Sequence, residues 1–181
     1  MPAAQLPTDS DLAAFSQSVE LAIAAAYDAL MPRFAERVQP VVAAFRLHHL
    51  AHADELARAA GEIGRAAGTT STAAPNAGIL AALAPRIEAA GDEPTALQLV
   101  VALENQLTAT HAFSLTTLEQ PATVRTVATI LPVEATHAAV AGGLLGTAVP
   151  DLFVNGSFES ALVSDGADPR MGFSPFAYPA P

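Results

Sequence analysis

The chain has 181 residues, 18 of them acidic and 8 basic, and a net charge of -10, which fits one domain of ordinary size. It contains no Cys, which excludes disulfides, thiolate metal sites and a Cys nucleophile, and its acidic balance argues against nucleic-acid binding by phosphate neutralisation. At 51% hydrophobic residues, the chain is too apolar to be disordered throughout and long enough to bury a core.

The Ala-rich composition favours helix, and we predict an all-α chain. The first long helix is expected to run from about residue 11 to 38, with Thr8, Asp9 or Ser10 as its N-cap. Pro32 lies inside that span and should kink the helix or split off its last turn, because proline has no N–H to donate.

The second long helix is predicted over residues 41–67, with Pro40 near its first position, where a missing N–H costs nothing. Residues 68–78 have the composition of a loop. A short helix over residues 79–90 is expected to cross between the two halves of the chain.

A strong start signal follows, with Asp92 as the cap and Pro94 in the first turn. The third long helix should extend to about Glu119, and the fourth should follow Pro121 and end between residues 142 and 146. We therefore predict a four-helix bundle over residues 1–148.

Residues 149–181 form an irregular tail that holds four of the eight Phe and one of the two Tyr. A wholly disordered segment would rarely be so aromatic, so we expect this tail to pack on the bundle or on a partner.

No uninterrupted apolar run of membrane-spanning length occurs, so no transmembrane helix is expected. The first ten residues lack the features of a signal peptide. The compartment is therefore cytoplasmic by default, or the protein is exported if this sequence is a mature form.

Helical periodicity places ionisable side chains on the apolar faces of all four long helices. These are Glu20 on the first helix, His49 and His52 on the second, Glu104 on the third, and Glu134 and His137 on the fourth. A buried carboxylate is costly unless it is paired or coordinates a metal, so we expect these groups to meet in the bundle interior at a metal site. The alternatives are a carboxylate–imidazole pair for Glu134 and His137, and hydrogen bonds to Ser, Thr or Tyr across the core for Glu20 and Glu104.

The spacing of these residues is repeated. Glu134 and His137 form Glu-x-x-His, which puts both side chains on one helix face. His49 and His52 have the same spacing with His in the first position, and the two helix pairs are offset by about 84 residues. The chain thus looks like a degenerate duplication of a helix pair.

This pattern resembles that of the ferritin-like di-iron carboxylate proteins, in which two Glu and two Glu-x-x-His motifs build a dimetal site. Within that superfamily, the chain is most similar to bacterial ferritin-like domain proteins, over about residues 10–146 and especially 130–140. The resemblance implies metal ligation by Glu20, His49, His52, Glu104, Glu134 and His137. It also implies a direct role for Tyr27, which otherwise reads as a packed core tyrosine.

The chain departs from the family pattern at His49, where a bridging Glu is expected. This leaves three interpretations open: an altered dimetal site, a single-metal site, or a site that has lost its metal. The mixed nitrogen and oxygen ligands suit Fe, Mn or Zn better than Mg or Ca. His48 is expected on the helix flank, and His111 in the core or beside the ligands.

The predicted function is iron- or manganese-dependent redox chemistry with dioxygen or peroxide, of the ferroxidase or oxidase kind, using one or two ions. The alternative is a non-catalytic ferritin-like module with a degenerate metal site, acting in partner binding, stress tolerance or the cell envelope. Whether the chain is an enzyme and whether it forms a homodimer are left open, and no partner protein is identified.

Overall fold

The computed structural model describes residues 8–67 and 74–147, and these are helical, with no strand among them. The elements are α1 (Asp9–Leu30), a short 3-10 helix η1 (Met31–Arg33), α2 (Gln39–Ala67), α3 (Ala77–Ala89), α4 (Glu93–Leu115) and α5 (Pro121–Leu144). The predicted all-α class is confirmed.

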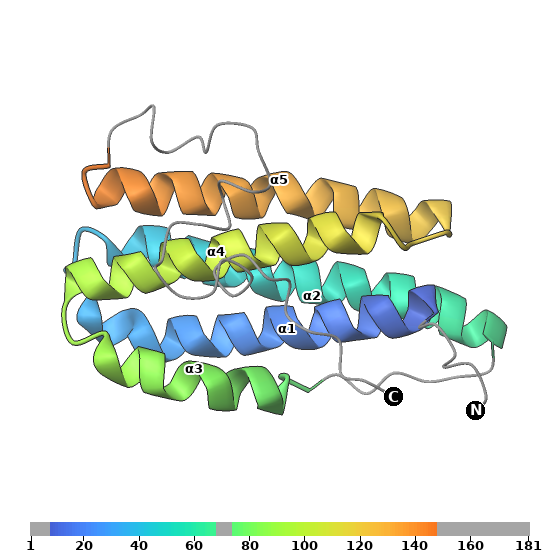
Figure 1. The fold of residues 1–181 in the computed structure, drawn as a ribbon, viewed down its shortest axis with the longest axis horizontal. Helices are drawn as coiled ribbons and strands as arrows, with labels where there is room; N and C mark the ends of the chain where they lie inside the picture. The colour runs from blue at the N-terminus through green and yellow to red at the C-terminus, as the bar shows by residue number, and fades with distance from the viewer. Residues whose placement is uncertain (1–7, 68–73, 148–181) are drawn as a thin grey trace, which may run out of the picture.

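The helices are arranged as two pairs, α1 with α2 and α4 with α5, which pack together into an elongated bundle (Figure 1). Contacts of α2 with α5 and of α1 with α4 join the pairs. The shorter α3 lies beside α1 and leads into α4. This is the predicted four-helix bundle with a short crossover helix.

Capping boxes open α1 and α4. Of the three predicted N-cap candidates of the first helix, Thr8 is the cap, so α1 begins at Asp9 instead of residue 11, and Asp92 caps α4 as predicted. Thr8 caps α1 and exchanges side chain–backbone hydrogen bonds with Asp11, and Asp92 caps α4 in the same way with Thr95. Each box satisfies backbone N–H groups that have no partner within the helix.

The predicted end of the first helix, at residue 38, is wrong, but the predicted interruption at Pro32 is present. The α-helix ends at Leu30, Pro32 lies in η1, and Phe34 is extended (φ -91°, ψ 139°) and buried. Pro32 cannot donate to the helical ladder, so the chain leaves the helix and places the Phe34 ring against the core.

Other helix ends also differ from the predicted ones. The second helix begins at Gln39 instead of residue 41, and α3 spans 77–89 instead of 79–90. The Asn76 side chain accepts a hydrogen bond from the Ile79 backbone N–H, and the Asn76 N–H donates to Ser18, which sets this earlier start. The third long helix ends at Leu115 instead of Glu119. Just after Leu115, the hydroxyls of Thr116 and Thr117 donate to backbone carbonyls three residues earlier.

The predicted ligands form a polar layer between two hydrophobic clusters of the bundle core. Along α2, Phe45 belongs to the larger hydrophobic cluster and Leu56 to a smaller one, and both flank His49 and His52. Along α5, Ile130 belongs to the smaller cluster and Ala141 to the larger, on either side of Glu134 and His137. The predicted ligands are therefore enclosed by core on both sides.

Among the described helices, α5 alone has the length and mean hydropathy (1.3 over its most apolar window) that a membrane span needs. Core helices pass the same test, and α5 packs along α4 and turns Glu134 and His137 inward. The predicted tail at 149–181 and the loop at 68–73 lie outside the described residues.

Candidate metal centre

The structure brings all six predicted ligands together in the bundle interior. Their exposed fractions lie between 0% and 9%. They form two overlapping groups of four, in each of which one nitrogen or oxygen per residue lies within 4.8 Å of the others. The groups are Glu20, His49, His52 and Glu134, and His49, Glu104, Glu134 and His137.

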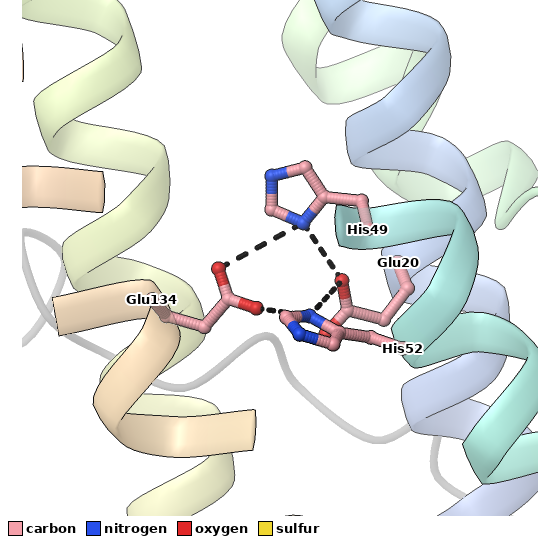
Figure 2. A group of neighbouring side chains, drawn as sticks. All are labelled: Glu20, His49, His52 and Glu134. Atoms are coloured by element: carbon pink, nitrogen blue, oxygen red, sulfur yellow. Dashed lines mark hydrogen bonds and ion pairs between the residues drawn. The ribbon is translucent and has the colours of Figure 1, made fainter. Parts of the chain in front are cut away.

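The first group contains side chains from three helices, α1, α2 and α5 (Figure 2). Glu20 Oε2 lies 2.9 Å from His49 Nδ1 and 3.8 Å from His52 Nδ1. Glu134 Oε1 lies 2.6 Å from His52 Nδ1, and Glu134 Oε2 lies 3.8 Å from His49 Nδ1. Two carboxylates and two imidazole nitrogens thus surround one small volume.

The second group centres on Glu104, from α4. His49 Nε2 lies 3.0 Å from Glu104 Oε1, and His137 Nδ1 lies 3.2 Å from Glu104 Oε2. The Tyr27 hydroxyl donates a short hydrogen bond to the same Oε1 atom. Tyr27 is fully buried, and its ring packs against Phe45 and His49.

Two further histidines contact the predicted ligands. His111 Nε2 lies 2.8 Å from Glu20 Oε1, in agreement with the expectation of a position in the core or beside the ligands. His48 is exposed, as predicted for the helix flank, but its Nδ1 lies 2.8 Å from His137 Nε2 and the two rings stack. The spacing of Phe45, His48 and His52 by three and four residues is the signal that places His48 on this side of α2.

The buried carboxylates and imidazoles shift one another's proton affinities. Burial opposes ionisation of Glu20, but hydrogen bonds from His111, His49 and His52 together outweigh it and hold the pKa of Glu20 well below its usual value. Burial also opposes a charge on His49, yet Glu104 and Glu134 raise its pKa well above the ordinary value.

Burial and neighbouring charges also shift the pKa values of His52, Glu134 and Tyr27. The pKa of His52 rises to about 9 despite burial, because Glu134 and Glu20 lie beside it. Burial and the neighbouring charges of Glu20 and Glu104 raise the pKa of Glu134. Burial and the charge of Glu104 also raise the pKa of Tyr27 well above its usual value, which keeps the hydroxyl protonated. The centre thus has strong affinity for positive charge.

Several polar atoms here have no hydrogen-bond partner. Both carboxylate oxygens of Glu134 and Nδ1 of His52 are buried without one, although Oε1 lies at ion-pair distance from His52 Nδ1 and Oε2 at ion-pair distance from His137 Nδ1. A buried carboxylate without a donor is rare and costly. A cation that accepts these lone pairs removes the cost, so the residues fit a metal ion, and the mixed oxygen and nitrogen donors suit a transition metal.

A comparison with known families matched the model for the ferritin-like domain to residues 8–147. No curated protein and no solved structure matched the chain. The match covers most of the sequence and all six predicted ligands, so the chain belongs to the ferritin-like domain family, as its residue pattern predicted.

Proposed function

We propose that this member of the ferritin-like family binds iron or manganese in its bundle core and acts in redox chemistry with dioxygen or peroxide, of the ferroxidase or oxidase kind. The observation that carries the proposal is the Glu134 carboxylate, which is buried among His and Glu side chains and makes no hydrogen bond, although His52 Nδ1 and His137 Nδ1 lie at ion-pair distance. When bound, either metal would supply the one-electron steps that these side chains cannot perform themselves.

The protein's own residues would hold and shield the ion. Glu20, His52 and Glu134 offer lone pairs toward a common volume, and apolar side chains close the bundle above and below it. Fixed ligands in a site closed to bulk water favour a defined coordination geometry over that of the hydrated ion. Zinc would fit the same donors but would not undergo redox change.

Tyr27 was predicted from the resemblance to act directly in the chemistry. Its hydroxyl donates to Glu104, which supports a role in positioning that carboxylate. A direct part in electron or proton transfer stays a prediction, which oxidation assays on Tyr27→Phe would test.

The experiment is elemental analysis of protein produced in iron- and manganese-supplemented cultures, followed by measurement of oxygen or peroxide consumption. The wild-type chain should contain a stoichiometric metal and consume oxidant, and Glu134→Gln should lose both properties. Glu88→Gln, which changes an exposed carboxylate on α3, is the matched control and should behave as wild type. A wild-type protein that contains no metal would refute the proposal.

A second candidate function, a non-catalytic ferritin-like module, is supported by the position of His49. Each of its ring nitrogens faces a different carboxylate, those of Glu20 and Glu104, so a protonated imidazole can balance buried charge without a metal. In that case a Glu134→Ala, His137→Ala double variant should complement a deletion strain as well as wild type does. Failure to complement, with a folded variant, would exclude this alternative.

A further inference from the structure

We propose that the centre takes a single metal ion, held by Glu20, His49 Nδ1, His52 Nδ1 and Glu134, and that Glu104 is not a ligand but the hydrogen-bond acceptor that orients His49. This inference rests on the metal binding proposed above. It specifies how many ions bind and which half of the centre they occupy.

The argument begins with the orientation of the His49 ring. Its Nδ1 faces Glu20 Oε2, in the first group of four, at 2.9 Å. Its Nε2 faces Glu104 Oε1, in the second group, at 3.0 Å. A neutral imidazole has one lone pair and one N–H. With the metal on Nδ1, the Nε2–H donates to Glu104, which gives the carboxylate–histidine–metal arrangement common in metalloproteins.

The hydrogen bonds of the two carboxylates on α4 and α5 separate their roles. Glu104 has three partners, because Tyr27 and His49 reach Oε1 and His137 reaches Oε2. Glu134 makes no hydrogen bond through either oxygen, and its nearest nitrogens, His52 Nδ1 at 2.6 Å from Oε1 and His137 Nδ1 at 3.3 Å from Oε2, lie at ion-pair distance. A cation bound to Glu134 would contact oxygens that make no hydrogen bond, whereas a cation bound to Glu104 must displace donors already in place.

Glu20 is arranged to face the same half. Its Oε1 lies 2.8 Å from His111 Nε2, which leaves Oε2 to face His49 and His52. The buried Nδ1 of His52 also has no hydrogen-bond partner. His52 belongs to the first group of four alone, whereas Glu134, whose oxygens also make no hydrogen bond, belongs to both groups.

The charge balance leads to the same conclusion. The family pattern supplies four Glu for two divalent ions, whereas this centre has three, because His49 stands where a Glu is expected. Two divalent ions would leave one uncompensated positive charge in a buried site, which is expensive. One ion is matched by Glu20 and Glu134, while Glu104 stays stabilised by its hydrogen-bond donors.

The test is the number of Mn²⁺ ions bound per chain at saturation, measured by elemental analysis and by electron paramagnetic resonance, which distinguishes isolated from coupled ions. Wild type should bind one isolated ion. Restoring the missing carboxylate with His49→Glu should raise the count to two coupled ions. Glu88→Gln is the control and should still bind one ion.

The metal affinity of Glu104 variants tests the role of Glu104 separately. Glu104→Ala should still bind one ion at saturation but with about 10- to 100-fold weaker affinity, the usual effect of losing a partner that orients a ligand. Glu104→Gln retains an acceptor for the His49 N–H and should lose less. Glu20→Gln and Glu134→Gln should abolish binding.

The outcomes separate this inference from the function on which it rests. Two ions per wild-type chain, or complete loss of binding in a folded Glu104→Gln, would overturn the single-ion assignment and leave metal binding intact. No ion in wild type would refute the proposed function itself. If His49→Glu does not fold, as judged by circular dichroism, the wild-type count and the Glu104 variants decide the question.

Discussion

Tyr27→Phe tests how strongly the centre's hydrogen bonds stabilise the metal-free bundle. The substitution removes one hydroxyl from a fully buried ring and leaves the contacts of that ring with Phe45 and His49 in place. What is lost is the hydrogen bond to Glu104, whose charged form that hydroxyl stabilises. The effect therefore comes from electrostatics far more than from packing.

The expected magnitude follows from the partners that remain. A hydrogen bond to a charged group contributes about 1.5–3 kcal/mol. Glu104 keeps His49 and His137 as donors, so the loss should fall at the lower end, about 1.5–2 kcal/mol. Urea unfolding at pH 7 in the presence of a chelator, followed by circular dichroism, measures this difference.

A double-mutant cycle with Glu104→Gln assigns the loss to this contact. The cost of Tyr27→Phe should shrink in the Glu104→Gln background, because the acceptor is then neutral. A loss below about 0.5 kcal/mol in the wild-type background, or equal losses in both backgrounds, would refute the reasoning.

Four further outcomes follow from the structure. Leu103→Ala, at a fully buried position, should destabilise the bundle by about 2–5 kcal/mol in urea unfolding. Asn76→Ala should cost about 0.5–2 kcal/mol, because it removes the cap of α3 and a bond to Ser18. Pro132→Ala should stabilise the metal-free protein by up to about 3 kcal/mol, since Pro132 is exposed inside α5. Mn²⁺ at about 100 times its dissociation constant should stabilise wild type by about 2.7 kcal/mol and leave Glu134→Gln unchanged.

Each of these outcomes has a result that contradicts it. A neutral Leu103→Ala would mean that the core relaxes into the space, and a neutral Asn76→Ala would mean that α3 needs no cap. A destabilising Pro132→Ala would show that the proline ring contributes to packing of α5. An equal stabilisation of Glu134→Gln by Mn²⁺ would place the bound ion elsewhere.

The helices and their inward faces were largely predictable from the sequence. The 3.6-residue period placed Glu20, Glu104 and Glu134 on apolar stripes, and all three are fully buried. The cap Asp92 was also recognisable, and Thr8 was one of three cap candidates, because capping depends on a few neighbouring residues. Helix ends set by long-range contacts were missed, as at α3, where Ser18 holds Asn76.

The sequence alone determined which side chains turn inward and that too few carboxylates are present for the family's dimetal pattern, because residue type and helical period are local properties. Only the tertiary structure decided which of those side chains meet. It directs Tyr27 to Glu104, His111 to Glu20 and His48 to His137, contacts between residues 77 to 91 positions apart. The relative rotation and height of packed helices set such distances, and no local pattern encodes them.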